Sequence, residues 1–268
     1  MVNGRAVVLG PGGVVGTAWL LGVVEGLRRN RIELADADLL VGTSAGAIAA
    51  AGLADGRDLN AYAELPADAA PALIVDPAVT AEVFEVLRGA GTNRSAALHR
   101  VGKLALSATT SPEQARLDRM KTLVGVGHWP HPNLLIPTVD IDSGEPKIWR
   151  GTDGVPVHQV VTASTAMPGL AAPVTIGAHR YIDGALRNGS NADLAEGMST
   201  LILIEPLAHV FPTTVPSSVR RVARIVPDPL AIETFGPDLD DRSSWPAVFA
   251  AGLRQGRAAA DEVRAVWQ

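Results

Sequence analysis

The stretch Leu39-Leu40-Val41-Gly42-Thr43-Ser44-Ala45-Gly46 decides the fold of this chain. Its apolar start has the composition of a short buried strand, and the alanine-rich segment that follows it favours a helix. A serine flanked by glycines at two-residue spacing, between a strand and a helix, is typical of a nucleophile elbow. This turn is so sharp that a side chain at Gly42 or Gly46 is expected to collide with the neighbouring strand or helix. The pattern predicts that Ser44 lies at the edge of a sheet as the nucleophile of a serine hydrolase.

The strand–turn–helix pattern occurs twice at the start of the chain. Residues 5–9 are apolar and strand-like, and they lead through a glycine-rich loop at 10–16 into an amphipathic helix over 17–29. The second copy is the strand at 39–41 with the helix at 45–53. Successive units of this kind predict an α/β fold with a mostly parallel central sheet, and they place ligands at the carboxyl ends of the strands.

The remaining segments are expected to complete one domain over residues 1–268. Residues 55–132 show helical patterns between Gly and Pro breaks and no strand pattern, which predicts a helical insertion over the site, either a cap or a structural layer. Residues 206–268 are expected to form a helical C-terminal extension. Further helices are predicted over 79–89, 95–107, 112–124, 156–166 and 246–267, and further strands over 134–141, 146–149, 174–176, 179–182 and 200–204.

The composition excludes several classes of function. The 268 residues include no cysteine, which rules out disulfides and thiol catalysis, and the net charge of −5 provides no footprint for nucleic acid. The one basic cluster, Arg220, Arg221 and Arg224, is interpreted as a solvated helix face. The N-terminal residues do not read as a signal peptide, and no apolar segment approaches the ~20 residues of a membrane span. We expect a soluble, cytoplasmic protein.

A serine nucleophile needs donors for the oxyanion, and the glycine-rich loop is the candidate. The loop directly precedes a predicted helix, so its backbone N–H groups and the helix N-terminus can converge on an anion. Pro11 has no N–H group, so the expected donors are Gly12, Gly13 and Val14.

The same loop also begins like a dinucleotide-binding G-x-G-x-x-G motif. The first two glycines fit, but the third position falls at Val15, one residue before Gly16. The acidic residue that such a motif requires would have to be Glu33 or Asp36. Nothing else in the sequence supports a dinucleotide site, so the oxyanion role is favoured.

The residues alone leave the general base open. In α/β-hydrolases the serine is followed by an acid and then by a histidine, and only His209 lies late enough to follow Asp183 in this order. That fold also places several strands before its elbow, whereas only one precedes Ser44 here. His128 and His131 have no third ligand at a recognisable spacing, and they are interpreted as part of a surface turn rather than a metal site. A base other than histidine therefore has to be considered.

Five blocks of the sequence together resemble the patatin-like phospholipases. They occur in that family's order and span residues 5–205. The blocks are Pro11-Gly12-Gly13-Val14-Val15-Gly16, Gly42-Thr43-Ser44-Ala45-Gly46, Ala163-Ser164-Thr165-Ala166-Met167-Pro168-Gly169, Tyr181-Ile182-Asp183-Gly184-Ala185 and Asn188-Gly189-Ser190-Asn191-Ala192. The resemblance implies a three-layer α/β/α fold and a lipid acyl hydrolase of the esterase or phospholipase A type.

The resemblance also implies a Ser-Asp dyad, with Ser44 as nucleophile and Asp183 as general base. Burial of a carboxylate raises its pKa and makes it a stronger base. The glycine-rich loop, joined by the N–H group of Ala45, would hold the oxyanion. Asp140 and Asp142 are weaker candidates for the base because they border a predicted hairpin turn. The implied partners are a lipid or other acyl ester and, transiently, a membrane surface, with no metal and no organic cofactor.

The chain departs from the family pattern at two positions. Pro11 stands where a glycine is usual, and Val15 stands where arginine or lysine is common. The second change removes a positive charge beside the anion-binding loop, which bears on head-group preference and rate. It leaves two alternatives: a lipid-binding or regulatory protein with weak or no turnover, and an acyltransferase that uses the same dyad.

Overall fold

The chain folds into two units, each with its own strands and helices. The computed structural model describes residues 4–64, 74–125, 127–211 and 213–268. The first unit comprises Met1–Ala69, Pro130–Leu135 and Gly189–Gln268, and the second comprises Ala70–Trp129 and Ile136–Asn188. The strand β3 (Leu134–Asp140) begins in the first unit and continues in the second.

The first unit contains a parallel sheet whose strands end at the same edge. The start of β3 pairs with β2, β2 with β1, β1 with β7, and β7 with β8, in every case parallel. In this register Leu9 is opposite both Gly42 and Ile204, and Ile204 is opposite Ile225. The carboxyl ends of four strands are therefore level, and the segments that follow them share one edge of the sheet. The strands are β1 (Arg5–Leu9), β2 (Leu39–Gly42), β7 (Thr200–Ile204) and β8 (Arg221–Ile225).

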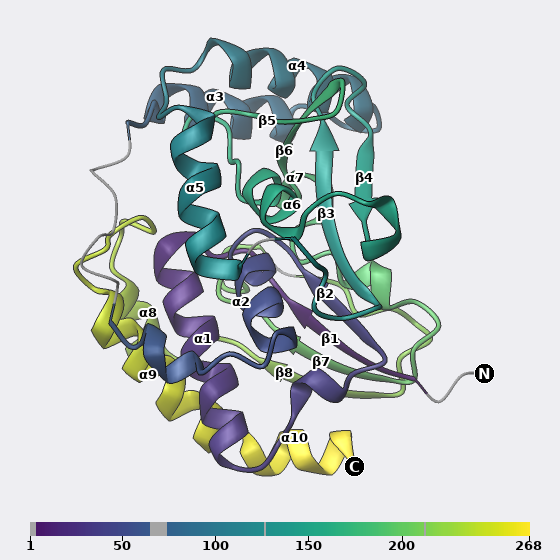
Figure 1. Cartoon of the computed structure of the whole chain (residues 1–268), viewed down its shortest axis with the longest axis vertical. Coiled ribbons are helices and arrows are strands. Elements are labelled where there is room, and N and C mark those ends of the chain that lie inside the picture. Colours follow the sequence, from purple (N-terminus) through teal and green to yellow (C-terminus); the bar gives the residue numbers. More distant parts are fainter. Residues whose placement is uncertain (1–3, 65–73, 126, 212) are drawn as a thin grey trace. The chain divides into compact units, whose positions relative to one another are not determined.

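Helices flank this sheet. Alternate strand residues such as Val8 and Leu203 pack on one face with Ala192 of the short 3-10 helix η4 (Ala192–Ala195). The long helix α1 packs along α9, and Trp19 Nε1 donates a hydrogen bond across this contact to Gln255 Oε1 at 2.7 Å (Figure 1). The helices of this unit are α1 (Gly13–Arg29), α2 (Ala45–Ala54), α8 (Pro229–Phe235), α9 (Trp245–Ala258) and α10 (Ala260–Trp267), with short 3-10 helices η1 (Leu34–Asp36) and η2 (Leu59–Tyr62).

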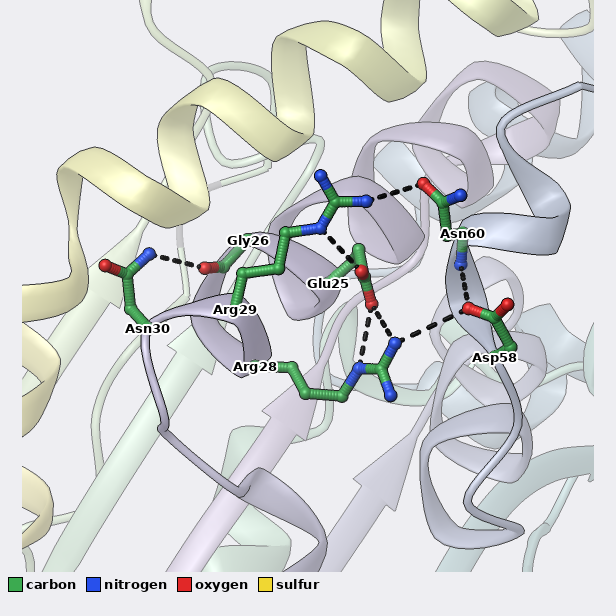
Figure 2. Close-up of polar contacts among 7 residues, drawn as sticks. All are labelled: Glu25, Gly26, Arg28, Arg29, Asn30, Asp58 and Asn60. Atoms are coloured by element: carbon green, nitrogen blue, oxygen red, sulfur yellow. Dashed lines mark hydrogen bonds and ion pairs between the residues drawn. The ribbon is translucent and has the colours of Figure 1, made fainter.

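A buried carboxylate ties the C-terminal end of α1 to η2. Glu25 is 2% exposed, and its two oxygens accept hydrogen bonds from Arg28 Nε at 2.8 Å and Arg29 Nε at 2.7 Å. Arg29 in turn donates to Asn60 Oδ1 at 2.6 Å (Figure 2). Because each charge has a partner, the cluster satisfies the carboxylate that the helix buries.

The second unit is built on an antiparallel sheet. The later part of β3 pairs with β4 on one side and with β6 on the other, and β6 pairs with β5. Helices α3 and α4 supply Val83, Leu98 and Val101 to a core shared with Val139 of β3 and Ile182 of β6. The elements of this unit are β4 (Pro146–Trp149), β5 (Val174–Ile176), β6 (His179–Asp183), α3 (Pro77–Arg88), α4 (Arg94–Ser107), α5 (Glu113–Val124), η3 (Gly151–Asp153), α6 (Val157–Ser164) and α7 (Ala185–Asn188).

These elements confirm the predicted α/β class with a mostly parallel sheet, and the three helices predicted within 55–132 are present as α3, α4 and α5. A cap position over the site and a single domain over 1–268 stay predictions.

The expectation for the basic cluster was wrong: Arg221 and Arg224 belong to a strand, β8, whose alternate residues Ala223 and Ile225 are buried. Among the described residues, no helix combines the length and the apolar character needed to cross a bilayer.

Candidate active site

Ser44 lies in a strained turn between β2 and α2. Its backbone φ is 53° and its ψ is −118°, in a region that non-glycine residues rarely adopt. Such a conformation costs about 1–3 kcal/mol and persists only where the surrounding structure enforces it. Ser44 is the N-cap residue of α2, and it is 8% exposed. The strained serine therefore stands at the carboxyl edge of the parallel sheet, directly before a helix N-terminus.

The two glycines beside Ser44 lie where the backbone leaves no room for a side chain. A Cβ atom on Gly42 would lie 2.6 Å from the carbonyl oxygen of Gly46. A Cβ atom on Gly46 would lie 1.9 Å from the carbonyl oxygen of Leu9, at the end of β1. These are the collisions with helix and strand that the sequence leads us to expect. They also show that the turn is pressed against the end of the neighbouring strand.

The glycine-rich loop adjoins this turn in the first unit. Thr43 donates its backbone N–H to the Leu9 carbonyl at 3.0 Å, and Gly10 donates to the Ile204 carbonyl at 2.9 Å. Two helices begin here, α1 at Gly13 and α2 at Ala45. The first N–H groups of a helix have no partner within it and carry partial positive charge. This edge of the sheet therefore has the electrostatic character of an anion site.

The structure separates the predicted donors into two kinds. The N–H of Val14 donates to the carbonyl oxygen of Leu239 at 2.9 Å, and that of Val15 donates to the same oxygen at 3.1 Å. The Val14 N–H could donate to an oxyanion only if its hydrogen bond to Leu239 were broken. The N–H groups of Gly13 and Ala45 are at the first helical positions, and Gly12 is the N-cap residue of α1. These three groups are the better candidates.

Asp183 lies in the second unit, at the end of β6. Its N–H donates to the carbonyl of Ala166 at 3.0 Å, and its Oδ1 accepts the N–H of Ala185 at 2.8 Å. The residue is 1% exposed. A Cβ on Gly184 would lie 2.0 Å from the carbonyl oxygen of Pro137. A buried carboxylate held by its own turn fits a general base, because burial disfavours the charged form and an orienting bond fixes its direction.

The segment 163–169 supports the Asp183 turn. Ala166 accepts the Asp183 N–H, and the hydroxyl of buried Ser164 donates to the Pro137 carbonyl at 2.8 Å. Arg116 of α5 donates to both the carbonyl and the hydroxyl oxygen of Thr165, at 2.9 and 2.8 Å. The Ser164 hydroxyl thus makes a structural hydrogen bond to a backbone carbonyl.

The other polar candidates belong to turns. Asp140 Oδ1 accepts the N–H groups of Asp142 and Ser143 at 2.8 and 3.1 Å, which caps the hairpin between β3 and β4. His131 Nε2 lies 3.1 Å from the Ala37 carbonyl. Within the described ranges, one group has the spacing of metal ligands: Asp140, Asp142 and His179. His179, the first residue of β6, has its Nδ1 3.0 Å from Asp140 Oδ2, so the contacts of Asp140 with His179 and with the hairpin account for this group.

Sequence reasoning did not single out four buried polar residues that hydrogen bonds connect to the elbow. Thr43, Ser190 and Asn191 lie within the quoted motif blocks but received no role there, and Glu205 lies outside the blocks; the exposed fractions of the four residues do not exceed 4%. The signal available was the lone acid directly after the apolar run 201–204, since an acid at the end of a buried strand needs a partner. The partners lie elsewhere in the sequence, so the pattern alone does not reveal the set.

Three comparisons relate the chain to known proteins. The family model described as patatin-like phospholipase matches residues 7–196. No curated protein matches the chain significantly. Among solved structures, VipD from Legionella pneumophila matches at 13% identity with a TM-score of 0.49, over 97% of this chain and 67% of that one. The type III effector protein ExoU matches at 17% identity with a TM-score of 0.42, over 96% of this chain and 52% of that one, so this chain spans about half the length of ExoU.

Proposed function

The chain belongs to the patatin-like phospholipase family, and from this premise we propose that it is a lipid acyl hydrolase that cleaves carboxylic esters through Ser44 and Asp183. The observation that carries the proposal is the strained conformation of Ser44, with φ of 53°, beside two helix N-termini at one edge of the sheet. A buried, strained serine has no evident role in stability, whereas strain of this kind is concentrated at functional turns.

The proposed reaction has two steps. Ser44 Oγ attacks the ester carbonyl while Asp183 takes its proton, and the N–H groups of Gly12, Gly13 and Ala45 hold the resulting oxyanion. Asp183 then gives the proton to the leaving alcohol, and the acyl group remains on Ser44. In the second step Asp183 takes a proton from water, the hydroxide attacks the acyl carbonyl, and Asp183 returns the proton to Ser44 Oγ as the fatty acid leaves.

The partners of the reaction form part of the same proposal. The substrate is a lipid or other acyl ester, met in the cytoplasm with transient contact to a membrane surface. The steps above need no metal ion and no organic cofactor. Val15 is apolar and completely buried in α1, so it offers no charge to a phosphate group. This favours, as a second candidate, a binding protein with slow turnover on phospholipids.

The test is active-site labelling combined with ester hydrolysis. A fluorophosphonate probe should label the wild-type protein, and Ser44→Ala should not be labelled. Asp183→Asn should lose about 10²–10⁴-fold in kcat for a p-nitrophenyl ester, which is the range that a general base typically contributes. Unfolding midpoints of the variants serve as the control for folding. Hydrolysis at the wild-type rate by either variant would end the dyad assignment.

The same assay separates the alternatives. Labelling without turnover of either p-nitrophenyl esters or phospholipid vesicles would favour the binding role. Transfer of the acyl group to an added alcohol, in preference to water, would identify an acyltransferase.

A further inference from the structure

A chain of buried hydrogen bonds runs through the first unit to the residue next to Ser44. It starts at Glu205, which directly follows β7 and is 1% exposed. One carboxylate oxygen of Glu205 accepts the Ser190 hydroxyl at 2.6 Å, and the other accepts Arg224 Nε at 2.7 Å. A buried carboxylate with partners on both oxygens forms strong, charge-assisted bonds, so its neighbours are held firmly.

Ser190 and Asn191 connect Glu205 to the elbow by hydrogen bonds. Asn191 is completely buried in a left-handed conformation, with φ of 56° and ψ of 35°. Its side-chain amide donates to the carbonyl of Gly189 at 3.0 Å and to the hydroxyl of Thr43 at 3.1 Å. The Thr43 hydroxyl donates in turn to the carbonyl of Ser190 at 3.4 Å. Thr43 is therefore held from both residues of this turn.

Ser190 and the residue after Glu205 also lie close to the glycine-rich loop. A Cβ on Gly10 would lie 2.6 Å from Ser190 Oγ, and a Cβ on Gly12 would lie 2.9 Å from Cβ of Pro206, the residue after Glu205. The segment that carries the buried carboxylate thus presses against the loop that precedes α1. The elbow and the glycine-rich loop, which form the two sides of the proposed anion site, therefore both contact residues of this buried polar set or residues next to it.

We propose that Glu205, Ser190, Asn191 and Thr43 are positioning residues, which hold Ser44 in its strained conformation and align it with the oxyanion donors. This inference rests on the proposed function. The physical reason is that a residue with unfavourable φ and ψ keeps its geometry only where its neighbours over-determine it. Misplacement of a nucleophile by about 1 Å can cost on the order of 10² in rate.

One pair of variants tests the link at Thr43. Thr43→Val keeps the shape and removes the hydroxyl, whereas Thr43→Ser keeps the hydroxyl. We expect Thr43→Val to lower kcat and the rate of fluorophosphonate labelling by about 10–100-fold with little change in KM. Thr43→Ser should restore most of this loss. Asn191→Gly provides a second route, because glycine accepts the left-handed backbone while removing the amide donor.

A matched pair of buried carboxylates separates positioning from general stability. Glu205→Gln and Glu25→Gln each neutralise a buried carboxylate that is paired with arginine in the same unit. Both should lower the unfolding midpoint. Glu205→Gln should also lower kcat per folded molecule, and Glu25→Gln should leave it unchanged, because the Glu25 cluster bonds to η2 and not to the elbow (Figure 2).

The outcomes distinguish the two proposals. If the wild-type protein is labelled and Thr43→Val, Asn191→Gly and Glu205→Gln are labelled at its rate, the positioning role is wrong while the proposed function stands. Equal losses of kcat in Glu205→Gln and Glu25→Gln would also overturn it, since the effect would then be one of stability. Absence of labelling in the wild-type protein overturns the proposed function and the positioning role together.

Discussion

The turns that carry Ser44 and Asp183 are equally crowded, but they are held by different means. At each turn a glycine approaches a backbone carbonyl so closely that a Cβ would lie about 2 Å away, Gly46 against Leu9 and Gly184 against Pro137. Ser44 has a positive φ and is the N-cap residue of α2. Asp183 instead orients its carboxylate with the N–H of Ala185. The proposed nucleophile therefore has a strained backbone, whereas the carboxylate of the proposed base is oriented by a hydrogen bond within its own turn.

The shared crowding should give the largest effects. Gly46→Ala and Gly184→Ala should each lower the free energy of unfolding by about 3 kcal/mol, because a Cβ 1.9 or 2.0 Å from a carbonyl oxygen forces the backbone to move. Urea unfolding of both variants measures this loss. Gly89→Ala is the control, since the φ of Gly89 is −81° and the atom nearest to its Cβ position lies at 3.6 Å. A loss at Gly46 or Gly184 no greater than that at Gly89 would show that the crowding is not rigid.

The difference between the turns predicts an unusual effect at Ser44. Ser44→Gly should be more stable than Ser44→Ala by about 1 kcal/mol, because glycine adopts a φ of 53° without the cost that a Cβ imposes. Both variants should be inactive, so stability and activity separate at this position. Thermal unfolding of the two variants side by side gives the difference. If Ser44→Gly proved the less stable variant, strain would not be what distinguishes the nucleophile turn.

The sequence predicts the two turns far better than their supports. Gly42 and Gly46 frame Ser44 within a local pattern, and strand and helix signals on either side are strong enough to locate the turn. The support at Glu205 depends on contacts with Ser190 and Arg224, which only the folded sheet brings together. The strand β8 was missed for a related reason. Of its five residues only Ala223 and Ile225 are buried, which is typical of a strand at the edge of a sheet. Because the exposed residues include two arginines, the segment lacks the apolar pattern of a buried strand.

The commitment of the Val14 N–H to Leu239 could not be predicted either. Leu239 lies in an irregular segment with no pattern that places it against the loop, and the hydrogen bond depends on that placement. Local chemistry thus predicts that the loop is an anion site, whereas tertiary contacts decide that the Val14 N–H already has a partner.

The smallest effect that we predict is a pH dependence of stability, which arises in the second unit, the one that contains Asp183. Burial, with a smaller contribution from the Lys121 ammonium, lowers the pKa of His158 in α6 below its usual value. The unfolded chain then binds more protons than the folded one as the pH falls below about 6.5, so stability decreases from neutral pH down to the folded pKa and levels off beneath it. His158→Gln should remove this dependence. Lys121→Gln should retain most of it, because burial is the larger cause.

Amide hydrogen exchange can locate this pH effect within the chain. The Asp183 N–H bonds to Ala166, two residues after α6, whereas the Thr43 N–H bonds to Leu9 in the other unit. Between about pH 7 and 5, after correction for intrinsic exchange, protection of the Asp183 amide should fall relative to that of Thr43. In His158→Gln the two amides should keep a constant ratio. A parallel decline of both amides in the wild-type protein would mean that the two turns share one unfolding unit, and the contrast between a strained nucleophile and a hydrogen-bonded base would then be one of local geometry alone.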